Sequence, residues 1–338
     1  MDREAVADAD RVPHGGSDDP EAIDFSANTN PRVPEGAREA YEGAFDVARR
    51  YPDDGYPDFR DAAAAHVDAS VAADAVVPTA GGLSALRLTI ATHLTSGDTA
   101  LVPTPSFGEY AREIRLQGAE PRFVSNDELL AADPEPHALA VVCTPNNPTG
   151  AAHDPAELRA FAERCAAAGT TLLVDEAFLG FTDLDSVAGQ QGVVVARSLT
   201  KLFGLPGLRA GFAVAHGDAR ERLVAARETW SLSAPAAAVG AHCLRDRAFV
   251  AATRERVRDE RERLRDALSA AGYGVAPSDA PFLLLSVDGD VDDLLSRAER
   301  EGLILRDART FRGLDSHVRV AVRERTENDR LVEVLTGD

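Results

Sequence analysis

The stretch from Arg197 to Phe212, RSLTKLFGLPGLRAGF, is the most informative in the chain because it contains the only lysine, Lys201. Lysine and arginine together number 36 in the 338 residues, and all of them except Lys201 are arginines. Arginine can replace lysine as a surface charge, but its permanently protonated guanidinium cannot condense with an aldehyde. We therefore interpret Lys201 as a lysine that forms a Schiff base. The alternative is that a single lysine has survived by chance.

The residues around Lys201 favour a phosphorylated aldehyde as its partner. The apolar run 193–196 predicts a buried strand, so Lys201 follows a strand end, where α/β proteins place their chemistry. The hydroxyl of Ser198 and the guanidinium of Arg209 lie on either side of the lysine and could hold a phosphate. Pyridoxal 5'-phosphate has both an aldehyde and a phosphate, and we predict it as the cofactor.

Composition narrows the class of protein. A formal net charge of −20 argues against nucleic acid or an anionic membrane as a partner. Loss of lysine with abundant acidic residues indicates a cytosol rich in salt, so we expect a halophilic protein. The charged N-terminus, Met1–Glu4, predicts no signal peptide, and no uncharged run approaches the ~20 residues that span a bilayer. We expect a soluble, cytoplasmic protein.

The cysteines give no sign of a metal site. Cys143, Cys165 and Cys243 are odd in number and widely spaced, which indicates neither a disulfide framework nor a zinc site. We interpret them as small buried residues in a reducing compartment.

Strand and helix patterns alternate along the middle of the chain and predict an α/β sheet. Apolar runs typical of short parallel strands lie at 100–103, 122–124, 139–143, 172–174, 193–196 and 212–215. Helical patterns lie at 37–48, 58–67, 82–93, 107–117 and 154–168. A long amphipathic helix at 246–271 precedes strand patterns at 282–287, 303–306 and 317–322, with helices at 291–301 and 327–335. These last elements predict a small α+β domain.

Polar and aromatic residues follow three further predicted strands and could contact the same cofactor, and a glycine turn could hold its phosphate. Asp175 ends the strand at 172–174 and could pair with a protonated pyridine nitrogen. An asparagine in 144–150 could donate to a phenolate oxygen, and Phe107 could stack on a flat ring. The paired glycines Gly81 and Gly82 open a helix, whose free N–H groups make a phosphate seat.

With these motifs in this order, the chain resembles the fold-type I pyridoxal-phosphate enzymes of the class I/II aminotransferase family. The matching marks are Pro145–Gly150, Asp175–Ala177, and Ser198–Lys201 with Arg209. The resemblance covers essentially the whole chain and implies an α/β fold. It implies an N-terminal arm (1–36) that joins the small domain. A large cofactor-binding domain (37–228) would have a mostly parallel central sheet, and a smaller α+β domain (229–338) would follow.

The resemblance also implies roles for individual residues. Lys201 would join the cofactor aldehyde, Asp175 would pair with the pyridine nitrogen, and Asn147 would touch the ring oxygen. Phe107 would stack on the ring, and the residues holding the phosphate would be Gly81, Gly82, Leu83, Ser198 and Arg209. Tyr51 matches a tyrosine that reaches the phosphate of a neighbouring subunit, which implies a homodimer. Arg319 matches the arginine that receives the substrate carboxylate.

Within the family, the chain resembles the threonine-phosphate decarboxylases of cobalamin biosynthesis. The marks are His14–Gly16, Asp24–Asn28, Phe107–Tyr110, Asp175–Phe178 and Arg319–Arg323. The resemblance implies decarboxylation of L-threonine O-3-phosphate to (R)-1-amino-2-propanol O-2-phosphate. Phe178 stands where many relatives have a tyrosine that bonds to the ring oxygen. A departure is Ala80-Gly81-Gly82, where a Gly-Asn-Gly turn is usual.

For the substrate we predict that the phosphate is held by His14 and Arg306 with the arm, including Gly15 and Asn28, and that Arg319 orients the carboxylate. The alternatives are a plain loop for the arm and an exposed strand-end arginine for Arg306. The main rival function is a histidinol-phosphate aminotransferase, which would use most of the same residues. A non-catalytic pyridoxal-phosphate-binding regulator is a remote rival, because such proteins usually carry a basic DNA-binding domain and this chain is acidic.

Overall fold

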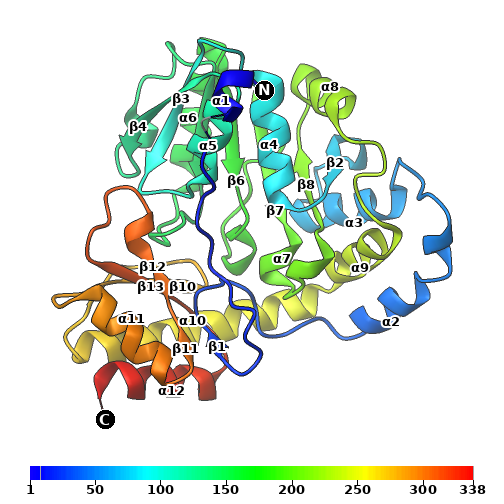
Figure 1. The fold of residues 1–338 in the computed structure, drawn as a ribbon. Helices are drawn as coiled ribbons and strands as arrows, with labels where there is room; N and C mark the ends of the chain where they lie inside the picture. Colours follow the sequence, from blue (N-terminus) through cyan, green and yellow to red (C-terminus); the bar gives the residue numbers. More distant parts are fainter. Residues whose placement is uncertain (8, 338) are drawn as a thin grey trace.

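The computed structural model describes residues 1–7 and 9–337, and its main feature is a seven-stranded sheet (Figure 1). The strand order is β2-β8-β7-β6-β5-β3-β4. The strands are β2 (Val76–Thr79), β3 (Thr99–Thr104), β4 (Glu120–Ser125), β5 (Leu139–Cys143), β6 (Thr171–Asp175), β7 (Val193–Ser198) and β8 (Gly211–Val214). Five strands, β4, β3, β5, β6 and β7, run parallel to one another, which confirms the predicted α/β sheet.

The strand β8 departs from the prediction of parallel strands. It runs antiparallel to both β7 and β2, so the expectation of a parallel strand at 212–215 was wrong in direction. The reason lies in the connection: segment 199–210 contains only the four-residue helix α7 (Leu199–Leu202) and a short 3₁₀ turn. A parallel neighbour needs a crossover, usually a helix across the face of the sheet. The edge strand β2 was not predicted.

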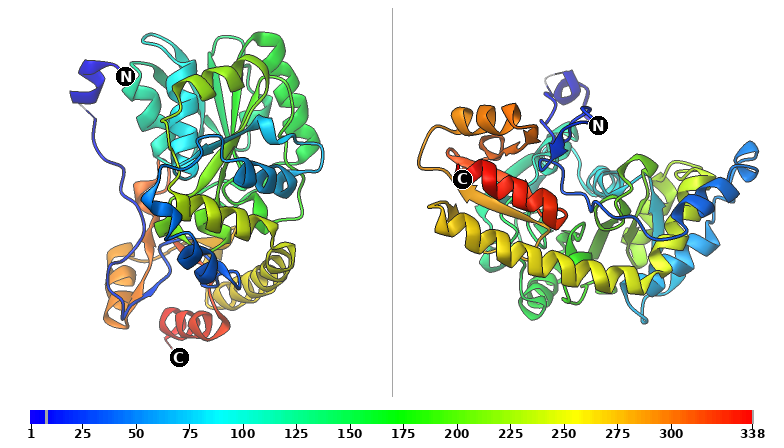
Figure 2. Two further views of the ribbon diagram at one scale, coloured as in Figure 1. Left: turned by 90° about the vertical axis from the view of Figure 1, so that its right-hand side faces the viewer. Right: turned by 90° about the horizontal axis from the view of Figure 1, so that it is seen from below.

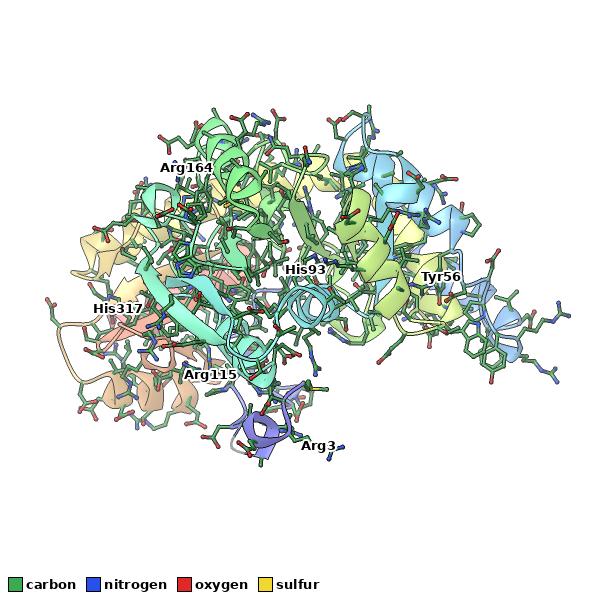
Figure 3. All side chains as sticks on the ribbon, turned by 90° about the horizontal axis from the view of Figure 1, so that it is seen from above. Arg3, Tyr56, His93, Arg115, Arg164 and His317 are labelled. Carbon is green, nitrogen blue, oxygen red and sulfur yellow. The ribbon has the colours of Figure 1, made fainter. Side chains whose placement is uncertain are left out.

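Helices cover both faces of this sheet, because alternate residues of each central strand point to opposite faces. In β5, Val141 packs under α4 (Gly82–His93), α5 (Glu109–Leu116) and α8 (Gly217–Ala226), whereas Val142 joins the core on the other face. That second face is covered by α3 (Pro57–Val67), α6 (Pro155–Ala168) and α9 (Ala234–Arg245). In Figure 3, Arg115 of α5 and Arg164 of α6 lie on opposite sides of the sheet. Because β4, β3, β5, β6 and β7 are parallel, their carboxyl ends all lie at the same edge of the sheet.

A smaller, antiparallel sheet lies below that edge. Its order is β12-β13-β10-β9, with β9 (Gly274–Val275), β10 (Phe282–Ser286), β12 (Arg306–Asp307) and β13 (His317–Ala321). The helices α11 (Val291–Arg300) and α12 (Arg325–Thr336) pack against it, and the 24-residue α10 (Arg247–Ala270) runs beneath both sheets (Figure 2). The domain boundary near residue 228 stays a prediction. The helix α9 that follows it packs against α3 and α2 (Ala37–Gly43), on the side of the large sheet.

The N-terminal arm connects the two sheets. The short helix α1 (Arg3–Ala7) lies beside α5, and the chain then descends to β1 (Ile23–Asp24), which pairs with β11 (Leu303–Ile304) near the small sheet (Figure 1). The arm therefore passes the edge where the parallel strands end. The three cysteines are buried and free, as predicted. None of the helices in the described part of the chain has the length and apolar character needed to cross a membrane.

Candidate active site

A pocket of about 340 Å³ opens between the carboxyl ends of the parallel strands, the small sheet and the arm. Of the fifteen residues that the sequence analysis singled out, thirteen line it: His14, Gly15, Asn28, Gly82, Leu83, Phe107, Asn147, Asp175, Ser198, Lys201, Arg209, Arg306 and Arg319. They come from segments spread over most of the chain, so the fold brings the predicted residues together at one place.

The two remaining residues lie outside the pocket lining. Gly81 is directly behind it, where a Cβ atom would come within 2.6 Å of an Arg209 nitrogen. Its φ of 90° also favours glycine. Tyr51 is 77% exposed and stacks on Trp230, with ring centroids 3.9 Å apart. None of the contacts among residues 1–7 and 9–337 joins Tyr51 to the pocket, so its role in a neighbouring subunit stays a prediction.

One end of the pocket is built for an anion. The N-terminus of α4 presents Gly82 and Leu83, and a Cβ atom on Gly82 would meet the Cβ of Ser198 at 2.9 Å. Ser198 caps α7, and its hydroxyl lies 2.8 Å from that of Thr200. Arg209, held in a left-handed conformation with φ of 54°, lines the same end. Free N–H groups, hydroxyls and a guanidinium are the donors that a phosphate accepts from.

Lys201 lies in α7 and lines the pocket. Burial, together with the positive charges of Arg319 and Arg209, lowers the pKa of its amine from 10.5 to about 8. A substantial fraction of the amine is therefore uncharged at neutral to mildly alkaline pH and able to attack a carbonyl carbon.

Asp175, the last residue of β6, lines the same pocket as Lys201 and is only 7% exposed. Burial raises the pKa of its carboxyl. Both oxygens are held by the protein: the Tyr110 hydroxyl donates to Oδ2 at 2.5 Å, and the Ala177 N–H donates to Oδ1 at 3.0 Å. The sequence analysis quoted Tyr110 only as part of the Phe107–Tyr110 motif and missed this contact. The spacing from Phe107 to Tyr110, one turn of helix, was the available signal.

The small sheet contributes two arginines that face the pocket side by side. Arg306 of β12 and Arg319 of β13 are register partners, 8% and 4% exposed. Arg319 donates to the Ser26 carbonyl at 2.8 Å and to the side-chain oxygen of Asn147, while its Nε has no partner among the described residues. Burial and the nearby Arg306 lower the pKa of Arg319 to about 9. The burial of Arg306 rules out the alternative of an exposed strand-end arginine.

The arm forms the remaining wall. The carbonyl of Pro13 accepts from Arg306 at 2.7 Å, and His14 Nε2 lies 3.0 Å from a carboxylate oxygen of Glu109. Asn28 is buried, and its side-chain oxygen has no partner in the described part of the chain. The arm is thus tied to α5 and to the small sheet at the mouth of the pocket, which is more than the plain loop held open as an alternative.

A buried ion pair behind the pocket was also missed by the sequence analysis. Arg197 donates from Nε and Nη2 to Glu176 Oε2 at 2.8 and 2.7 Å, and Ser186 donates to the same carboxylate. Glu176 follows Asp175, and Arg197 precedes Ser198. The pair therefore fixes the ends of β6 and β7 relative to each other.

Comparisons with known proteins agree with this geometry. The family model described as aminotransferase class I and II matches residues 20–335. The threonine-phosphate decarboxylase of Salmonella typhimurium is 34% identical over 93% of this chain and 92% of its own length. Histidinol-phosphate aminotransferase 2 of Archaeoglobus fulgidus is 31% identical over 94% of this chain and 93% of its own.

A solved structure, the L-threonine-O-3-phosphate decarboxylase of Porphyromonas gingivalis, superposes with a TM-score of 0.84. It is 25% identical, and the match covers 93% of this chain and 98% of that one. Fold and site together define a fold-type I pyridoxal-phosphate enzyme. The chain belongs to the class I and II aminotransferase family, whose members use pyridoxal 5'-phosphate.

The residues of the pocket fit that cofactor. The glycines leave room where any side chain would collide with Arg209 or Ser198, and the donors around them suit a dianionic phosphate. The uncharged amine of Lys201 suits the aldehyde, and the buried carboxylate of Asp175 suits a protonated ring nitrogen. The flat ring of Phe107 lines the same pocket.

Proposed function

We propose that the protein decarboxylates L-threonine O-3-phosphate to (R)-1-amino-2-propanol O-2-phosphate, a step of cobalamin biosynthesis. The observation that carries the proposal is the pair of buried arginines, Arg306 and Arg319. Neither forms an ion pair among the described residues: Asp307, which follows Arg306, is paired with Arg309, and Asp24 acts on Arg319 only from a distance. A small substrate with one carboxylate and one phosphate supplies an anion for each. The likeness to the Salmonella typhimurium enzyme, over nearly the full length of both chains, supports the same substrate.

The residues divide the work of this reaction between them. Bound pyridoxal phosphate supplies an electron sink that stabilises negative charge on the carbon next to the substrate nitrogen. Arg319, with its free Nε, binds the carboxylate and sets the direction of the bond that breaks. Arg306 and His14 hold the phosphate at the mouth. The Nζ of Lys201 attaches the cofactor and then carries the proton that replaces CO2 on the substrate carbon.

A second candidate is a histidinol-phosphate aminotransferase. The Archaeoglobus fulgidus relative is nearly as similar as the decarboxylase, and two adjacent arginines could also bind the two carboxylates of 2-oxoglutarate. The two functions differ in the fate of the substrate carboxylate and in the need for a second substrate.

Product analysis of purified protein in high salt separates the candidates. The protein is offered O-phospho-threonine alone, and separately histidinol phosphate with 2-oxoglutarate. We expect CO2 and aminopropanol phosphate from the first sample, with no oxo acid required, and neither product from the Lys201→Ala variant. Glutamate from the second sample, without CO2 from the first, would make the protein an aminotransferase.

We also propose that the protein is a homodimer in which Tyr51 reaches the phosphate end of the partner's pocket. The support is an exposed aromatic surface on α2 and the following turn: Tyr41, Phe45 and Tyr51, with Trp230 beside them, are between 45% and 77% exposed. Exposed aromatic clusters of this kind mark protein interfaces. Light scattering should give twice the chain mass, and Tyr51→Phe should weaken cofactor binding without changing that mass. A monomer would contradict the proposal.

A halophilic character is proposed from the charge. Self-repulsion at a net charge of −20 destabilises the folded state unless salt screens it. The thermal midpoint should therefore rise steeply between about 0.1 M and 1 M KCl, as the screening length falls from about 10 to 3 Å.

A further inference from the structure

The hydroxyl of Tyr110 makes a contact that the proposed reaction has not used. Tyr110 is 1% exposed, and its hydroxyl donates to Asp175 Oδ2 at 2.5 Å. The Ala177 N–H holds the other oxygen of the same carboxylate. Asp175 is therefore oriented on both sides by the protein itself, before any ligand arrives.

Tyr110 is itself held firmly in place. Its ring packs edge-on against Phe107, with centroids 5.6 Å apart and planes at 84°, and it belongs to the core between α4, α5 and the sheet. Burial and the negative charge of Asp175 raise the pKa of Tyr110 well above its ordinary value, so the phenol keeps its proton and remains a donor. The Tyr110 side chain thus contacts both Phe107, the predicted stacking residue, and Asp175, the predicted partner of the ring nitrogen.

A donated hydrogen bond favours the charged form of a carboxylate and lowers its affinity for a proton. This hydrogen bond opposes the effect of burial, which raises the pKa of the Asp175 carboxyl. Without the Tyr110 hydroxyl, Asp175 would be a stronger base, and a proton shared with a ring nitrogen would move toward the carboxylate. The ring would then lose positive charge and accept electrons less readily.

We propose that Tyr110 is a positioning residue that acts through Asp175: it fixes the direction of the carboxylate and keeps the shared proton on the ring nitrogen of the cofactor. The proposal rests on the proposed role of the site as a pyridoxal-phosphate site. It does not depend on decarboxylation rather than transamination, since both reactions draw electrons into the same ring.

The test is the Tyr110→Phe variant, which removes the hydroxyl and keeps the ring. Protein loaded with cofactor labelled with ¹⁵N in the ring is compared by NMR with wild type. We expect the ring-nitrogen signal to move toward the unprotonated position and kcat to fall about tenfold, with KM little changed, as for loss of a hydrogen bond to a charged group. The matched control is Tyr273→Phe, which removes a hydroxyl bonded to the Leu335 carbonyl at 3.0 Å, far from the pocket. It should leave the signal and kcat unchanged.

A ring-nitrogen signal in Tyr110→Phe that matches wild type would overturn the proposal, whatever happens to the rate. If the variant does not fold, wild-type protein with its five tyrosines replaced by 3-fluorotyrosine provides a second test. The fluorinated phenol is a stronger donor, so the signal should move in the opposite direction, and an unmoved signal would again overturn the proposal. Failure of the proposed function is seen separately, as absence of CO2 from wild-type protein.

Discussion

The two sheets differ in how they treat a buried arginine. Arg197, at the end of β7 in the large sheet, is clamped by both nitrogens of its fork to Glu176. Arg319, in β13 of the small sheet, is buried to a similar degree, but its hydrogen bonds go to a carbonyl and an amide oxygen, and its pKa falls to about 9. An arginine behind the pocket, Arg197, thus has an anionic partner, whereas Arg319, which lines the pocket, has none among the described residues.

The difference separates structural charge from functional charge. A buried ion pair with both partners satisfied fixes neighbouring elements and needs nothing from outside. A buried cation without an anion is costly, and a fold that retains it gains by binding an anionic ligand. Lys201, Arg306 and Arg319 belong to the second kind, because none of them is in an ion pair within the described part of the chain. The following experiments test whether changing an unpaired buried charge lowers activity and whether changing a paired one lowers stability.

The largest effect is expected for Lys201→Ala. Activity should fall to background, because no other lysine exists to attach the cofactor. Stability should not fall, since the variant removes a cation from a site that disfavours charge. Borohydride reduction followed by peptide mass analysis checks the attachment: wild type should carry the cofactor on the Lys201 peptide. Cofactor fixed covalently to the Lys201→Ala variant, or to another residue of wild type, would refute Lys201 as the attachment site.

Arg319→Leu should lower kcat/KM for the anionic substrate by about 100-fold or more, as expected when one partner of a buried charge contact is lost. The thermal midpoint should stay level or rise, because an unpaired buried charge is replaced by an apolar side chain. Steady-state kinetics and thermal unfolding measure the two effects. A large loss of stability with an unchanged KM would place Arg319 in the same structural class as Arg197.

Glu176→Gln should show the reverse pattern. Arg197 would keep its burial and lose its anion, so the free energy of unfolding should fall by about 3–5 kcal/mol. The kcat/KM of the folded fraction should change little. Urea unfolding measures the loss, and the double variant Glu176→Gln/Arg197→Met should recover part of it, because no unpaired charge remains. Equal losses in the single and double variants would contradict this account.

The smallest effect concerns pH. With a pKa of about 8 for Lys201, the rate at which pyridoxal phosphate attaches to cofactor-free protein should rise about tenfold per pH unit and level off near pH 8. Between about 8 and 10.5 the unfolded chain binds more protons at this lysine than the folded one, so this group adds stability as pH rises through that window. Stopped-flow absorbance measures the rate. Arg319→Leu should move the plateau to higher pH, and an unmoved plateau would remove Arg319 as a cause.

Local patterns in the sequence were enough to predict most of the helices and strands. The continuous apolar runs at 139–143 and 193–196 are typical of strands buried on both faces, and both are strands in the structure. The direction of β8 was missed because it depends on how the chain returns after α7, which leaves no trace in the apolar pattern. The contacts of Tyr110 with Asp175 and of Arg197 with Glu176 were missed because each joins residues from different segments.

Local sequence signals were enough to predict the family and its cofactor: one lysine after a strand end, an aspartate at the end of another, and a glycine turn opening a helix. These signals are local, since each depends on residues adjacent in the chain. The tertiary structure decided which charges are paired. Arg306 and Arg319 lie more than a hundred residues beyond Lys201, yet the Arg319 charge helps to lower the pKa of its amine. Desolvation and Coulomb interactions act through space, so only the folded chain sets them.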